Sequence, residues 1–247
     1  VREGADLVDV GGESTRPGAV PVPTAEEQRR VVEVVRELSA DGVLVSIDTR
    51  HAEVARACVD AGAVIVNDVS AGRGDDAMWP FIAESGLPYV LMHNRGDGPS
   101  RNDLAEYPAA SIRTQPVWRE LDARAAEAIE AGIAADQLIV DPGIGFAKDA
   151  TMNWSLAHED PRSTWSHGGC DHLVDRPVVL GVSRKRFLAT HPDGRPREDD
   201  TMEQRDRLTV DLTERAARHG LWCVRVHDVA PNAEAVRRVR RDDWMSS

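Results

Sequence analysis

LIVDPGIGFAKD, residues Leu138 to Asp149, joins an apolar run to an acidic residue and then to a glycine-rich loop. The apolar run predicts a strand covered on both faces, as in a parallel sheet. Asp141 closes that strand, and Pro142 and Gly143 end it abruptly. Because a buried carboxylate needs hydrogen-bond partners, we expect Asp141 to face a site at the strand end.

The same alternation of short apolar runs and longer amphipathic segments continues along the chain. It indicates βαβ units around a parallel sheet. The predicted strands are Asp6–Gly11, Val43–Asp48, Val64–Asp68, Tyr89–His93, Leu138–Asp141, Val178–Val182 and Cys223–His227. The predicted helices are Ala25–Leu38, Ala52–Ala61, Asp76–Glu84, Ala110–Ala131, Met202–His219 and Asn232–Arg240.

Polar residues at the strand ends favour a closed barrel over an open doubly wound sheet, because barrel enzymes build their sites at the carboxyl ends of their strands. The expected fold is α/β, a (β/α)8 TIM barrel, in a single domain over residues 1–247. Only seven strands are predicted, and the segment Val1–Gly4 has the pattern of a helix end. We therefore expect the first strand and most of the first helix to be missing from this chain.

Composition limits the partners. The net charge of −12 argues against nucleic acid, whose phosphates attract basic surfaces. The three cysteines form no CxxC pair, which argues against structural zinc and fits a reducing cytoplasm. No apolar run approaches the roughly 18 residues of a membrane span. The expected location is the cytoplasm, without a membrane partner.

Two segments supply candidate donors for an anion. In DVGGESTRPGA, which starts at Asp9, paired glycines let the backbone approach a ligand, and Thr15 and Arg16 offer donors. A solvated turn is the alternative. VVLGVSRKRF, which starts at Val178, places Ser183 and Lys185 near a helix start, where backbone N–H groups bind anions. An exposed basic cluster is the alternative there.

Other strand ends carry more ambiguous signals. Asp48 either caps the following helix or accepts N–H groups of a heterocycle, and Asn67 with Asp68 could read a ring edge. In VRVHDV, strand alternation places Arg225 and His227 on one face, an arrangement that suits a phosphate or pyrophosphate. A lone methionine or histidine such as Met92 or His93 is more often structural, whereas Phe146 fits stacking on an aromatic substrate and packing in the core equally well.

These segments together resemble the dihydropteroate synthases, the folate-pathway enzymes of the pterin-binding barrel family. The matching stretches follow the family's order from Gly4 to Val229. They are GADLVDVGGESTRPGA, VSIDTRHAEVA, GAVIVNDVSAG, VLMHNRG, LIVDPGIGFAK, VVLGVSRKRFL and VRVHDV.

The resemblance implies a transferase that condenses 6-hydroxymethyl-7,8-dihydropterin pyrophosphate with p-aminobenzoate, giving 7,8-dihydropteroate and pyrophosphate. It implies catalytic roles for Lys185, Arg225 and His227. It implies binding roles for the residues Thr15, Arg16, Pro17, Asp48, Asn67, Met92, Asp141, Phe146 and Ser183. Asp141 would accept hydrogen bonds from the pterin edge, and Arg225 and His227 would hold the pyrophosphate. Sulfonamides would compete with p-aminobenzoate, and the last helices would form a homodimer.

The family also uses Mg²⁺, and its asparagine ligand lies in an N-terminal NVTPDSFSDGG-like loop that has no match in this sequence. No metal ligand is therefore assigned in the chain. A second departure is the segment Asp149–Leu173, which lacks the family's leucine-rich helix and for which no full helix is predicted. Two alternatives follow: a non-catalytic pterin-binding paralogue or inactive fragment and, less favoured, a pterin-dependent methyltransferase.

Overall fold

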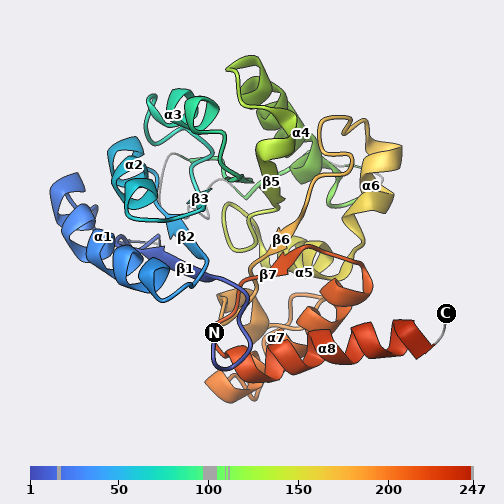
Figure 1. The fold of residues 1–247 in the computed structure, drawn as a ribbon. Helices are drawn as coiled ribbons and strands as arrows, with labels where there is room; N and C mark the ends of the chain where they lie inside the picture. Colours follow the sequence, from blue (N-terminus) through green and yellow to red (C-terminus); the bar gives the residue numbers. More distant parts are fainter. Residues whose placement is uncertain (16–17, 97–104, 109, 111, 246–247) are drawn as a thin grey trace.

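The computed structural model describes residues 1–15, 18–96, 105–108, 110 and 112–245 (Figure 1). Its strands are β1 (Val8–Gly11), β2 (Val45–Asp48), β3 (Ile65–Asp68), β4 (Tyr89–Met92), β5 (Leu138–Asp141), β6 (Val179–Leu180) and β7 (Cys223–Val224). Its α-helices are α1 (Thr24–Ala40), α2 (Ala52–Asp60), α3 (Met78–Ser85), α4 (Gln115–Glu130), α5 (Ala150–His158), α6 (Pro161–Gly168), α7 (Met202–Arg218) and α8 (Val229–Met245). Two short 3-10 helices are η2 (Ala135–Gln137) and η3 (Arg186–Ala189).

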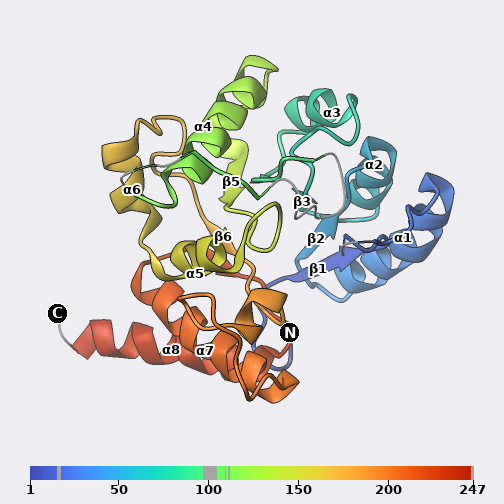
Figure 2. The ribbon, with the colours of Figure 1, turned by 180° about the vertical axis from the view of Figure 1, so that it is seen from behind.

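The strands are parallel and follow the order of the chain. β1 to β5 form one sheet, and β6 pairs with β7. A bridge between Val140 and Val178 joins the two groups of strands. The helices surround this ring of strands, and α7 and α8 pack side by side (Figures 1 and 2). The predicted TIM-barrel fold is confirmed. Within the described residues, β1 and β7 each pair with one neighbour, and the ring is open between them.

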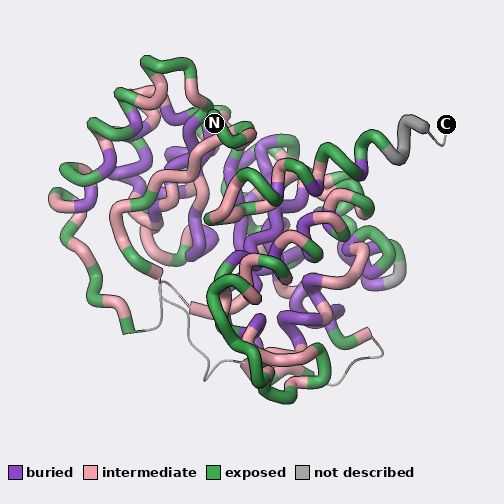
Figure 3. The backbone as a smooth tube through the Cα atoms, turned by 90° about the horizontal axis from the view of Figure 1, so that it is seen from below, coloured by how far each residue is buried: buried purple, intermediate pink, exposed green. Residues whose placement is uncertain are grey.

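Strand alternation separates two apolar layers. One side of the strands packs against the helices, as Ile47 and Leu91 do in the main core. The other side forms a small inner layer, because a strand turns alternate side chains to opposite faces. The inner layer consists of Ile65, Val90, Ile139 and Val179, with Leu7 and Cys223 packed against it. The buried backbone accordingly gathers at the strands and the inner helix faces (Figure 3).

The segment between β5 and β6 contains two helices that the sequence analysis did not predict. Asp149 caps α5, because its side chain accepts a hydrogen bond from the backbone N–H of Met152 at 2.6 Å. Asp160 caps α6 in the same way, and Pro161 takes the first helical position, where its missing N–H costs nothing. Two short helices, each with its own N-terminal cap, therefore occupy this segment.

Several element ends also differ from the predictions. β6 ends at Leu180 and β7 at Val224, short of the predicted Val182 and His227. The pairing of these strands stops early, although the N–H of Arg225 still donates to the carbonyl of Leu180 at 3.0 Å. The residues that follow β6 and β7 are therefore loops, and their side chains reach the site from loop positions.

Candidate active site

Polar side chains stand at the carboxyl ends of neighbouring strands, two residues beyond the inner apolar layer. Asp48 of β2 is in register with Asn67 of β3, and Met92 of β4 is in register with Asp141 of β5. Alternation turns each of them to the same face as the inner apolar residues. The sequence-predicted site residues of four adjacent strands therefore face the inside of the barrel at the carboxyl ends of the strands.

Arg225 crosses the opening between β7 and β1. Its Nε donates to Oδ2 of Asp9 at 2.6 Å, and its Nη2 donates to Oδ2 of Asp48 at 3.3 Å. Asn67 Nδ2 donates to the same oxygen of Asp9 at 3.3 Å. One guanidinium and one amide thus hold two carboxylates together. Burial lowers the pKa of Arg225, but the charges of Asp9 and Asp48 raise it by more. The net pKa lies above the ordinary value, so the residue stays a cation.

The carboxyl group of Asp48 has an unusual electrostatic environment. Burial and the nearby charge of Asp9 raise its pKa from 3.8 to about 7, against the opposing effect of Arg225. At neutral pH the group is therefore divided between its protonated and ionised forms. N–H donors from a bound heterocycle would favour the ionised form. Asp48 is thus poised to accept hydrogen bonds from a ligand.

Asp141 and Lys185 form the opposite side of the site. Burial raises the pKa of Asp141, while Lys185 and the backbone N–H of Gly143, 2.7 Å from Oδ1, lower it. Burial lowers the pKa of Lys185 to about 8, and Asp141 opposes that shift. Lys185 Nζ donates to the carbonyl of Ile144 and lies 5.3 Å from the centre of the Phe146 ring. The lysine therefore turns inward, toward the loop after β5.

The remaining predicted residues take different places. Ser183 Oγ lies 2.9 Å from Nδ1 of His227 and accepts its backbone N–H at 3.2 Å, so these two loops meet. Arg225 contacts Asp9 and Asp48, and His227 contacts Ser183. Met92 and Phe146 pack together with Val69. Thr15 is half-buried in the loop after β1. Arg16 and Pro17 lie outside the described residues.

Two residues of the strand ends correct the sequence reasoning. Asp68 turns away from Asn67 to the helix side, where it accepts hydrogen bonds from Tyr89 Oη at 2.8 Å and from the N–H of Gly72 at 2.7 Å. Neighbours in a strand face opposite ways, so they cannot both read a ligand edge. Asp9, which the predicted site omitted, is the partner that holds Arg225 and Asn67. An acidic residue within the apolar run of β1 was the available signal.

Comparison with known proteins agrees with this arrangement. The model of the pterin binding enzyme family matches residues 1–227. The dihydropteroate synthase of Mycobacterium leprae is 44% identical over 244 residues, which are 97% of this chain and 81% of that protein. The chain belongs to the dihydropteroate synthase family. These enzymes are transferases of folate biosynthesis, and the family predicted from the sequence is confirmed.

Solved dihydropteroate synthases have the same fold. The Xanthomonas albilineans enzyme with 4-aminobenzoic acid has a TM-score of 0.81 at 38% identity, covering 98% of this chain and 81% of that one. The same bacterium's enzyme in complex with 7,8-dihydropteroate has a TM-score of 0.77 at 35% identity, covering 98% and 83%. Similarity at this level extends over nearly all of the chain, including every strand that carries a candidate site residue.

Dihydropteroate synthases depend in general on magnesium. In the described ranges, the one group of three acidic or histidine side chains within 4.8 Å of one another is Glu13, Glu27 and His51. Glu13 is paired with Arg50 there, and His51 Nδ1 lies 2.7 Å from Glu27. Both carboxylates of this group therefore already have side-chain partners. The described residues therefore do not fit a protein-held Mg²⁺.

No helix formed by the described residues between positions 1 and 245 is both long enough and apolar enough to cross a bilayer.

Proposed function

We propose that this dihydropteroate synthase condenses 6-hydroxymethyl-7,8-dihydropterin pyrophosphate with p-aminobenzoate and releases pyrophosphate. The observation that supports the proposal is the group of strand ends from which Asp48, Asn67 and Asp141 face the inside of the barrel. Carboxylate and amide groups in that arrangement match the donor-rich edge of an aminopyrimidine ring. The cations of Lys185 and Arg225 flank them on the two sides.

Pterin binding relies on two carboxyl groups whose pKa values are raised. Asp141 and Asp48 are costly to ionise without a ligand, because burial disfavours their charge. N–H donors from the pterin satisfy both groups at once. Asn67 adds a donor and an acceptor between them, and Met92 supplies an apolar face.

The p-aminobenzoate subsite is proposed beside the loop after β5. Phe146 offers an aromatic face, and Lys185 holds a positive charge close to it. Ser183 lies on the far side of Lys185 and contacts His227. Thr15, Arg16 and Pro17 of the loop after β1 complete the subsite in this proposal. A carboxylate substrate suits these donors, and the same donors would bind a sulfonamide.

The reaction needs no protein nucleophile. The bond between the pterin methylene carbon and the bridging pyrophosphate oxygen breaks, and its electron pair leaves on the oxygen. The amine nitrogen of p-aminobenzoate then forms the new carbon–nitrogen bond and releases a proton. Arg225 and His227 stabilise the negative charge of the departing group, since fixed cations near developing charge lower the barrier. Lys185 orients the aromatic amine.

We further propose that Mg²⁺ enters with the pyrophosphate, and we assign it no residue among those described. The three cysteines are free thiols, which supports a cytoplasmic location. A single domain over residues 1–247 and a homodimer through the last helices, α7 and α8, complete the proposal. The pair of helices is available for this role because α8 lies on the outside of the barrel (Figure 1).

The test is an assay with both substrates and Mg²⁺ that follows pyrophosphate and dihydropteroate. Lys185→Met should lower kcat/KM by about 100-fold, as loss of an electrostatic group at a reaction centre does. Arg184→Gln is the matched control, because Arg184 is exposed and paired with Asp206. Tight binding of the pterin pyrophosphate without any release of pyrophosphate would instead support the non-catalytic paralogue.

A further inference from the structure

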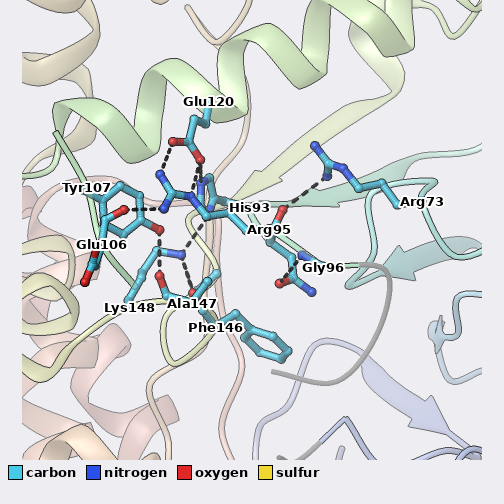
Figure 4. A network of polar contacts seen from close by, with 12 residues as sticks. Arg73, His93, Arg95, Gly96, Glu106, Tyr107, Glu120, Phe146, Ala147 and Lys148 are labelled. Carbon is cyan, nitrogen blue, oxygen red and sulfur yellow. Dashed lines mark hydrogen bonds and ion pairs between the residues drawn. The ribbon is translucent and has the colours of Figure 1, made fainter. Parts of the chain in front are cut away.

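Lys148 is a buried lysine at the end of the loop after β5, and the proposed chemistry does not use it. Its side chain reaches back into the loop (Figure 4). Nζ lies 3.0 Å from the carbonyl oxygen of Gly143, 2.9 Å from that of Phe146 and 2.8 Å from Nδ1 of His93. An ammonium group has three N–H donors, and here it meets three acceptors. Burial lowers the pKa of Lys148 well below its ordinary value and Asp141 opposes that shift, but the geometry favours the ammonium form, because a neutral amine would leave one acceptor unpaired.

His93 has one protonation state that satisfies this geometry. Its Nε2 lies 3.0 Å from a carboxylate oxygen of Glu120, so Nε2 carries the hydrogen and Nδ1 accepts from Lys148. Burial, followed by the charge of Lys148, lowers the pKa of His93 to about 4, so the ring is neutral. Glu120 stays ionised, because hydrogen bonds from Arg95 and His93 outweigh its burial and lower its pKa to about 2.

Glu120 is connected to the loop after β5 by a second route, through Arg95 and Tyr107. Arg95 binds Glu120 and lies 3.8 Å from the centre of the Tyr107 ring. Tyr107 Oη donates to the carbonyl of Ala147 at 2.8 Å (Figure 4). Helix α4, through Glu120, is thereby connected to both ends of the loop. The loop backbone has little freedom, since a Cβ on Gly143 would lie 1.9 Å from the His93 carbonyl.

The outer side of this loop belongs to the site. The N–H of Gly143 binds Asp141, and the carbonyl of Ile144 accepts from Lys185. Phe146 points away from Lys148 in Figure 4, and its ring lies 5.3 Å from Lys185 Nζ. Two lysines therefore hold one short loop from opposite sides, one inside the protein and one at the strand ends.

We propose that Lys148, oriented by the His93–Glu120 pair, is a positioning residue that fixes Phe146 and the Ile144 carbonyl for p-aminobenzoate. The inference rests on the proposed function and deepens it. Lys148 does not touch substrate; it acts through the backbone carbonyls that it binds. Loss of its charge releases two carbonyls and a histidine together, so Lys185 loses a fixed partner and Phe146 a fixed face. The pterin side depends less on this loop, because it meets the loop through Asp141 and the N–H of Gly143, while Asp48 and Asn67 stand on β2 and β3.

The test separates the two substrates in steady-state kinetics of the whole chain. Lys148→Met should raise the KM for p-aminobenzoate by about tenfold, the cost of a lost charged hydrogen bond, and raise the KM for the pterin pyrophosphate by a clearly smaller factor. Glu120→Gln is the milder variant and should raise the first KM about threefold. The matched control is Asp122→Asn on the same helix, which breaks a comparable buried contact with His172 away from the loop.

A purely structural role gives a different result, since a destabilised enzyme loses active molecules and lowers kcat with both KM values unchanged. That outcome, or an equal rise in both KM values, overturns the inference.

Hydrogen exchange of the Gly143 and Gly145 amides gives a readout without turnover. Exchange should speed up in Lys148→Met and Glu120→Gln but not in Asp122→Asn, and unchanged exchange also overturns the inference. An unmodified chain that forms no dihydropteroate, while its Lys148→Met variant still exchanges faster, refutes the proposed function alone.

Discussion

Replacing Asp48 by asparagine should stabilise the protein while weakening its binding of pterin. The carboxyl of Asp48 shares a buried space with Asp9, and only Arg225 compensates both charges. Asparagine keeps the shape and an oxygen that Arg225 can reach, but it carries no charge. The variant therefore removes the repulsion between two buried carboxylates, which should stabilise the fold. It also removes a charged acceptor for the N–H groups of the pterin, which should weaken binding.

The magnitude follows from the shifted pKa. The pKa rises from 3.8 to about 7, and one unit corresponds to about 1.4 kcal/mol. Because the folded state holds the proton more tightly, Asp48 contributes stability that is fully present below pH 3.8 and is lost as the pH rises to about 7. Above that pH the ionised group costs the fold roughly 4 kcal/mol. Local relaxation in the variant reduces the expected gain to about 2–4 kcal/mol.

The assay is urea unfolding of the protein and of Asp48→Asn at several pH values from 5 to 8. The difference in unfolding free energy should grow with pH and level off above about 7. Asp193→Asn is the control, since the hydrogen bonds from Arg195 lower the pKa of Asp193 and give the opposite sign. A difference that is constant across the pH range, or that favours the unmodified protein at pH 8, would refute the electrostatic reasoning.

Three further predictions concern the same site. If the Lys185 ammonium is required, kcat/KM should fall as the pH rises through about 8, and a pH–rate profile of Lys185→Arg should lack that limb. Pterin binding near pH 7 should release protons as Asp48 ionises, which calorimetry in buffers of different ionisation enthalpy would detect; binding without proton exchange would contradict it. Gly143→Ala should destabilise the protein by about 2 kcal/mol or more, because the residue has φ +66° and no room beside His93; an unchanged melting temperature would be inconsistent with this backbone.

The sequence predicted the strands of the barrel and the position of the site at their carboxyl ends for a physical reason. Buried parallel strands are continuous apolar runs, and a polar residue such as Asp141 at the end of one has few other uses. The same pattern could have separated Asn67 from Asp68, because adjacent strand residues face opposite sides. It could also have included Asp9, an acidic residue within the apolar run of β1.

Other features depend on contacts between distant segments and cannot be read from local patterns. The three acceptors of Lys148 are brought together only when β4 and β5 pair and the loop folds back. The two helices after β5 are signalled locally by Asp149 and Asp160, yet their interrupted pattern hides them. The hydrogen bond from Arg225 to Asp48 likewise forms only when the first and last parts of the chain come together, since the two residues lie 177 positions apart.

Arg225 also links the charges of two neighbouring strands, because its guanidinium contacts Asp9 of β1 and Asp48 of β2. In the proposed reaction the same guanidinium meets the departing diphosphate. An anion that binds it competes with both carboxylates, so occupancy of the site should weaken these two contacts. Solvent anions at high concentration should compete in the same way and weaken the binding of diphosphate.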